Sequence, residues 1–342
     1  PAVDVPALLR AVASDELELA RQALESLAAG IYHQGSYFSA TAPAIPFLLE
    51  LAAAPIPARA DLILFLADMS GTTSELELAY QPYLFQSTPG LPDYPEAVAT
   101  IDAIRAGHAC FVAALAAEDP KVRACAAYAL AILGLANPWT DSLAHEPDPN
   151  VQITLAFALA RLGHPPALDQ REGLVGDVID GLRFADDPER GLAALARLLL
   201  LEHPLERVTM PFYEGDLVRF AAQVLVDRAG DDARAFALAD AALSARLARG
   251  ERIQDPPRGP SLRISDEPDA STDAWDYFAD LPLRTIANAM ASLAFGQRLR
   301  DPELLRRSDL DDRQRRVLAL TRDHAIPIAI AGAPWIEPEA MA

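Results

Sequence analysis

The chain has 342 residues, 51% of them hydrophobic, and a formal net charge of −20 at pH 7. This acidity argues against a nucleic-acid groove, which needs a basic surface to displace counterions, and against binding to anionic membranes. It permits a basic protein partner, or simply a solvated acidic surface. Because no signal peptide and no membrane-spanning apolar run is visible, we expect a cytoplasmic protein.

The N-terminal residues are predicted to form a first pair of helices, over residues 4–12 and 15–29. The second helix lies in a sixteen-residue frame, Asp15–Gly30, that returns more clearly further along the chain. With Gly30 at the position that ends the later copies, we expect a degenerate repeat here. It would cap one end of the hydrophobic core.

A loop rich in aromatic and small polar residues is predicted over residues 31–43. Pro43 and Pro46 then open a helix that ends near Ala53, which completes an N-terminal cap over residues 1–56. The loop is either a recognition element at one edge of the protein or a plug for the end of the core. Its candidate ligand- or partner-binding side chains are Tyr32, His33, Gln34 and Tyr37.

After a helix predicted over residues 57–69, the chain enters a proline-rich and aromatic insertion at 70–95. The insertion is too long for a turn between two helices, which usually spans about 2–8 residues. It is either a flap over exposed core or a functional loop across one face. Its candidate binding side chains are Tyr80, Tyr83 and Phe85.

A long helix is predicted over residues 96–117, and two clear repeats follow. The blocks Asp119–Gly134 and Asp148–Gly163 start 29 residues apart and share nine identical positions. Each begins with an aspartate suited to cap a helix and a proline suited to its first position, and each ends in a glycine suited to a left-handed residue. Apolar residues recur between them at helical spacing, so each helix needs a neighbouring helix on either side.

The pattern D-P-x-V-R-x-x-A-x-x-A-L-x-x-L-G, carried by Asp119–Gly134, resembles the second helix of a HEAT repeat. The likeness is to the short bacterial form shared with phycobilin-lyase-type proteins. It implies an all-α fold, a right-handed α-α superhelix (a HEAT-like solenoid) of roughly 6–7 helix pairs with two irregular insertions. In the second block Gln152 replaces the usual arginine, which weakens the expected Asp–Arg ladder. HEAT-like arrays serve many unrelated functions, so the resemblance does not fix one.

The rest of the chain continues the array as a single body over residues 1–342. Central repeats are expected over 96–248, a linker loop over 249–272 and a C-terminal cap over 273–342. Within the central repeats, four further helices are predicted after the two clear copies, at residues 172–184, 187–201, 213–229 and 231–248.

No catalytic or metal-binding signature stands out. The six histidines are scattered, and zinc, phosphate-loop, dinucleotide and hydrolase motifs are missing from the sequence. Cys110 and Cys125 are expected to be reduced, buried residues, and acidic pairs such as Asp186–Asp187 and Asp311–Asp312 to be helix caps. No cofactor and no metal is therefore expected, and a non-enzymatic role is favoured.

Three functions are compatible with this pattern to different degrees. The first is a protein–protein interaction scaffold whose curved helical surface binds a partner, with a basic partner as one option. The alternative is a small-molecule-binding or catalytic protein with a pocket formed by loops 31–43 and 70–95. DNA handling, known for some HEAT-like glycosylases with a basic face, is disfavoured by the net charge. The sequence favours the scaffold.

Overall fold

The computed structural model describes residues 4–33, 36–70, 95–135, 141–167, 172–202, 205, 209–229, 233–252, 281–295, 310–324 and 326. The chain divides into two compact units. Unit 1 comprises Pro1–Leu182 and Leu205–Gly215, and unit 2 comprises Arg183–Pro204 and Asp216–Ala342. A single solenoid over residues 1–342 stays a prediction.

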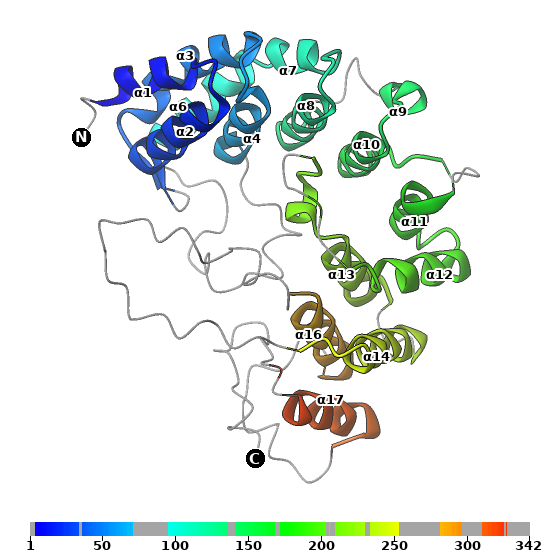
Figure 1. Ribbon diagram of the computed structural model, residues 1–342. Coiled ribbons are helices and arrows are strands. Elements are labelled where there is room, and N and C mark those ends of the chain that lie inside the picture. Colours follow the sequence, from blue (N-terminus) through cyan, green and yellow to red (C-terminus); the bar gives the residue numbers. More distant parts are fainter. Residues whose placement is uncertain are drawn as a thin grey trace. The chain divides into compact units, whose positions relative to one another are not determined.

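The predicted all-α class is confirmed. The described residues are mostly helical, and their helices pack on neighbours in chain order, as a helical repeat requires (Figure 1). The right-handed superhelix implied by the HEAT resemblance stays a prediction. None of the helices in the described ranges has both the length and the apolar character needed to cross a membrane.

Unit 1 contains two layers of helices (Figure 1). One layer holds α1 (Val5–Val12), α3 (Thr41–Ala53), α7 (Ala109–Ala114) and α9 (Ser142–His145). The other holds α2 (Leu17–Ile31), α4 (Arg59–Ser70), α8 (Pro120–Ile132) and α10 (Pro149–Arg161). Each helix of the first layer packs on the helix that follows it in the second, and successive second-layer helices pack on one another. The layers are completed by α6 (Pro95–Ala106), which packs on α3 and α4, and by α11 (Gly173–Leu182), which packs on α10.

The two clear repeats form the helices α8 and α10 as the sequence predicts. Asp119 Oδ1 accepts a hydrogen bond from the backbone N–H of Lys121 at 2.9 Å, and Asp148 Oδ1 accepts two, from Asn150 and Val151. Both helices end in a left-handed glycine, Gly134 with φ 74° and Gly163 with φ 79°. In each case the next backbone N–H bonds back to a carbonyl five residues earlier, which satisfies the helix end.

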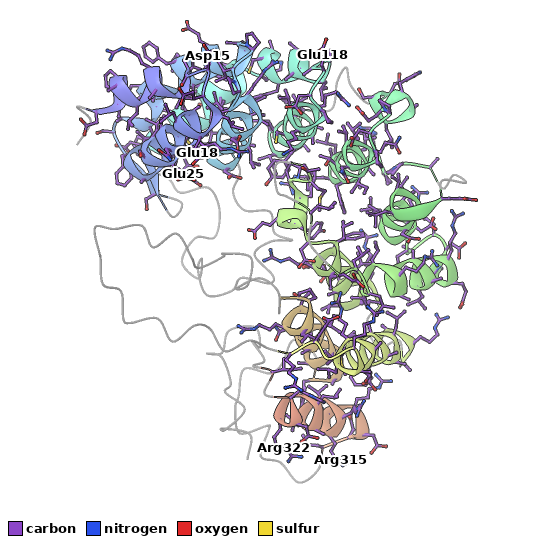
Figure 2. The ribbon with its side chains drawn as sticks, in the orientation of Figure 1. Asp15, Glu18, Glu25, Glu118, Arg315 and Arg322 are labelled. Atoms are coloured by element: carbon purple, nitrogen blue, oxygen red, sulfur yellow. The ribbon has the colours of Figure 1, made fainter. Side chains whose placement is uncertain are left out.

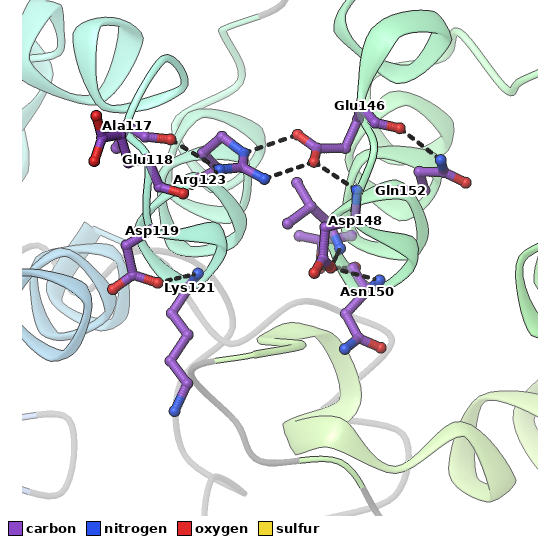
Figure 3. A network of polar contacts seen from close by, with 11 residues as sticks. Ala117, Glu118, Asp119, Lys121, Arg123, Glu146, Asp148, Asn150 and Gln152 are labelled. Carbon is purple, nitrogen blue, oxygen red and sulfur yellow. Dashed lines mark hydrogen bonds and ion pairs between the residues drawn. The ribbon is translucent and has the colours of Figure 1, made fainter.

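A buried ion pair fastens α8 to the segment that precedes α10 (Figure 3). The Arg123 guanidinium donates to both carboxylate oxygens of Glu146, at 2.9 and 2.7 Å, and to the carbonyls of Ala117 and Glu118. Gln152, at the equivalent position of the next repeat, donates to the Glu146 carbonyl at 2.6 Å. The link thus runs from Arg123 to a glutamate between the helices, and Gln152 keeps the bond to the backbone without the charge.

Three local expectations are wrong. The helix predicted over 96–117 is broken between α6 and α7 at Gly107, where a Cβ would lie 2.3 Å from the Leu49 side chain of α3. Gly30 does not end α2. The helix continues to Ile31, and the chain becomes extended at Tyr32. Part of the loop predicted at 31–43 is a small antiparallel hairpin, in which β1 (Tyr32–His33) pairs with β2 (Ser36–Tyr37).

Within the described residues, unit 2 contains the α-helices that follow α11. They are α12 (Pro188–Leu198), α13 (Leu217–Ala229), α14 (Ala233–Ala248), α16 (Leu281–Phe295) and α17 (Asp312–Asp323). Asp187, Asp216 and Asp311 each cap the start of a helix with a side-chain oxygen. The fully buried Arg246 of α14 holds the end of α12 through the carbonyls of Leu199 and Leu201 and pairs with Glu251.

Candidate functional site

The predicted site residues Tyr32 and Tyr37 come together, with ring centroids 5.1 Å apart. Their hydroxyls donate to the last carbonyls of α4, Tyr32 to Asp68 at 3.2 Å and Tyr37 to Met69 at 2.8 Å. Burial raises the pKa of the Tyr37 phenol to about 12, although the hydrogen bond with Tyr32 acts in the opposite direction. Both hydroxyls therefore close a helix end, which is a structural use of this part of the predicted loop.

The other predicted residues are less defined by the structure. His33 contributes its backbone to the hairpin, in register with Ser36. Gln34, Tyr80, Tyr83 and Phe85 lie outside the described residues. A pocket formed by loops 31–43 and 70–95 therefore stays a prediction.

An apolar groove of about 700 Å³ opens between α1 and α3 in unit 1. Its lining takes one face of each helix together with the turn before α3: Val5, Pro6, Leu9, Arg10, Ala13, Ser39, Ala40, Pro43, Ala44, Phe47, Glu50 and Leu51. The α1 residues follow a helical period, as do those of α3. Small side chains at Ala13, Ala40 and Ala44 leave this space open, because larger ones would fill it. Part of the predicted 31–43 loop thus borders a real cavity.

The two helices that form the groove expose apolar faces. Phe47 is 56% exposed, and Pro43 and Pro46 lie beside it on the outward side of α3. A helix on the surface of a protein usually presents charged and polar residues to water. Yet α1 has Arg10 as its one charged residue, and α3 has Glu50. This shortage of charge is visible in the sequence, but it does not by itself show which face stays open.

Acidic residues surround the groove. Asp4 precedes α1, and Asp15 and Glu16 follow soon after Ala13, all of them exposed. Glu18 and Glu25 are exposed on α2, which packs on α1 but does not line the groove (Figure 2). Of the bases nearby, Arg21 pairs with Asp61 at 3.2 Å, and Arg59 donates to the Ala52 carbonyl. Residues 4–31 thus contain five acids and two arginines, so this end of unit 1 carries a net negative formal charge.

A second apolar face of unit 1 is covered by the chain itself. Tyr128 of α8 and Phe157 of α10 occupy the same position in their repeats, and both contact Phe212, with ring centroids 4.9 and 5.4 Å away. Phe157 also contacts Tyr213, at 5.3 Å. All four aromatic residues are at most 8% exposed. This face is thus occupied by the segment 209–215.

The covering segment has an unusual backbone. Tyr213 and Glu214 both lie in the left-handed region, with φ of 53° and 56°, and Gly215 follows with φ 85°. The Leu205 N–H donates to the Gly215 carbonyl at 2.9 Å, and a Cβ on Gly215 would lie 1.8 Å from the Leu205 carbonyl oxygen. Left-handed non-glycine residues are costly, so the packing of the Phe212 and Tyr213 rings must hold this backbone in place.

The positions and pKa shifts of the titratable side chains in the described ranges show whether they could form a metal site or a reactive group. No group of three His, Cys, Asp or Glu residues that could hold a metal ion occurs among the described residues. Both cysteines are free, and burial raises the pKa of the Cys110 thiol to about 11, so it is a poor nucleophile at neutral pH. Burial also raises the pKa of the Asp216 carboxyl, which caps α13.

Comparisons with protein-family models, with curated proteins and with solved structures found no match.

Proposed function

We propose that this chain is a helical scaffold that binds another protein, and that the partner docks in the groove between α1 and α3. The observation that supports this most directly is the exposed ring of Phe47 beside an apolar groove with few charges. Aromatic side chains next to a cavity are typical anchors of protein interfaces.

The burial of this face provides the driving force. Removing apolar surface from water yields roughly 25 cal/mol per Å², so covering the Phe47 ring and the groove walls stabilises a complex. Contiguous apolar patches on a helix surface are typical of interaction sites. A second apolar face of unit 1, that of α8 and α10 in the other layer, is covered by the segment 209–215 and is not open to a partner.

The test compares three forms of the full chain as bait: wild type, Phe47→Ala and Val98→Ala. Val98 of α6 is also an exposed apolar residue, 48% exposed, and it does not line the groove. We expect a protein captured by the wild type to be retained by Val98→Ala and lost by Phe47→Ala. If every captured protein is retained by Phe47→Ala, the proposal is wrong.

The volume of the groove favours a second candidate, binding of a small apolar molecule. Small-molecule sites usually have volumes of about 300–1,000 Å³, and this groove lies within that range. The side chains of Arg10, Ser39 and Glu50 would orient such a ligand. Mass spectrometry of the purified chain under native conditions separates the two functions, because a bound small molecule adds mass that Phe47→Ala should remove.

A further inference from the structure

We infer that the occupant of the α1–α3 groove is an amphipathic helix of the partner, with lysine or arginine along the edges of its apolar face. This inference rests on the proposed function and adds the secondary structure and the charge of the bound segment. It is supported by the polarity of the groove walls, the dimensions of the two helices and the charges around them.

The polarity of the groove excludes an extended peptide. A bound strand leaves half of its backbone N–H and C=O groups facing the groove, where each needs a hydrogen-bond partner. The lining offers polar side chains only at Arg10, Ser39 and Glu50. A helix satisfies its backbone internally and presents only side chains, so it enters such a groove without unpaired groups.

The dimensions fit a helix of three to four turns. α1 and α3 belong to one layer (Figure 1), and both helices line the groove between them. At 1.5 Å per residue, the 8 residues of α1 give one wall of about 12 Å, and the 13 residues of α3 give the longer wall of about 20 Å. A partner helix of about 14 residues covers that length with apolar residues at i, i+3, i+4, i+7 and i+11.

The surrounding charge selects a basic helix. Residues 4–70 contain eight acids and three arginines. Arg21 and Arg59 are engaged by Asp61 and by the Ala52 carbonyl, which leaves Arg10 against Asp4, Asp15, Glu16 and Glu50 near the groove. The same charges disfavour a second copy of this chain as occupant, because two acidic rims would meet and each copy carries a net charge of −20.

The experiment uses a synthetic, fluorescein-labelled peptide of about 14 residues, with leucine at the five apolar positions and lysine along both edges. Its binding to the full chain is measured by fluorescence anisotropy. One control peptide has the same composition in scrambled order, and another carries glutamate in place of every lysine. We expect binding of the first peptide to be at least about tenfold tighter than that of either control.

Matched variants of the protein locate the bound peptide. Phe47→Ala should weaken binding about tenfold and Val98→Ala should not, while the circular dichroism of both stays that of the wild type. The double variant Asp15→Asn, Glu16→Gln should weaken binding and reduce its dependence on salt between about 50 and 500 mM. Glu118→Gln, exposed at another part of unit 1 (Figure 2), should change neither.

Each contrary result removes a distinct part of the inference. If the scrambled peptide binds as tightly as the designed peptide, the bound segment is not recognised as an amphipathic helix. If the glutamate peptide binds as tightly, the groove does not select a basic helix. In both cases the proposed function survives if Phe47→Ala still abolishes capture of a protein. Dimerisation of the wild type but not of Phe47→Ala in sedimentation velocity identifies a second copy as the occupant and overturns the inference.

Discussion

Of two apolar faces of unit 1, one is covered by another segment of the chain and the other is exposed. The face of α8 and α10 that carries Tyr128 and Phe157 is covered by the chain's own Phe212 and Tyr213. The groove between α1 and α3 has the same apolar character, yet Phe47 is 56% exposed there. Both faces consist of helix surfaces with almost no charge, so composition alone does not separate them.

The difference lies in what covers each face. Covering α8 and α10 requires a backbone with two consecutive left-handed non-glycine residues, Tyr213 and Glu214. Such a conformation costs of order 1–3 kcal/mol per residue, and the chain accepts it because the rings of Phe212 and Tyr213 become buried. Within the described residues, no equivalent segment lies over α1 and α3. This contrast is why we place the partner in that groove.

The largest expected effect comes from making the same substitution on both faces. Phe212→Ala removes a buried ring that contacts Tyr128 and Phe157 and should lower the free energy of unfolding by about 3–5 kcal/mol. Phe47→Ala, on the open face, should change it by less than about 0.5 kcal/mol. Urea titrations followed by circular dichroism measure both values. Similar losses for the two variants would remove the distinction between the faces.

A smaller effect is expected from closing the space that the covering segment needs. In Gly215→Ala the new Cβ meets the Leu205 carbonyl oxygen at a left-handed position, which should cost about 3 kcal/mol. Gly134→Ala has a similar φ but no atom within 4 Å, so it should cost only about 1–2 kcal/mol. The dye ANS should bind Gly215→Ala more strongly, because the rings of Tyr128 and Phe157 become accessible. Equal costs would show that the close approach to Leu205 is unimportant.

The ion pair between the repeats should matter less. Glu146→Gln removes the carboxylate that accepts two hydrogen bonds from Arg123 and so fastens α8 to the segment before α10. Hydrogen bonds to charged groups contribute about 1.5–3 kcal/mol, so we expect a loss of about 2 kcal/mol in urea titrations. Glu118 is exposed and joins the network only through its backbone carbonyl (Figure 3). Glu118→Gln should therefore lower the free energy of unfolding by less than about 0.5 kcal/mol. A comparable loss for both would contradict this role of Glu146.

The smallest effect concerns the hairpin that leads into α3 and depends on pH. Because burial raises the pKa of Tyr37 from 10.0 to about 12, the folded state holds the phenolic proton more tightly than the unfolded state. Its contribution to stability is complete below pH 10 and is lost as the pH rises towards 12. Tyr37→Phe should lose about 1 kcal/mol at neutral pH and show a shallower loss in alkali. Parallel pH dependence of the melting temperatures of the two proteins would count against this.

The repeats show how much could be predicted from the sequence. Caps, first-position prolines and terminal glycines fix α8 and α10 because each acts within a few residues of its own helix. The break at Gly107 could not be predicted in this way, since it depends on Leu49 of a distant helix. The hairpin at Tyr32–Tyr37 was missed for a similar reason, as its tyrosines find their partners on α4.

For the candidate site, too, some features follow from the sequence and others only from tertiary packing. The sequence by itself determined the all-α class, the ends of α8 and α10 and the acidity, because local hydrogen bonds, periodicity and composition set them. It also contained two helices with one charged residue each, although the face that stays open is not visible in a linear pattern. Only the tertiary structure decided that the segment 209–215 returns to cover α8 and α10 and that α1 and α3 leave a groove. The physical reason is that burial is shared between segments far apart in the chain, so it follows from packing.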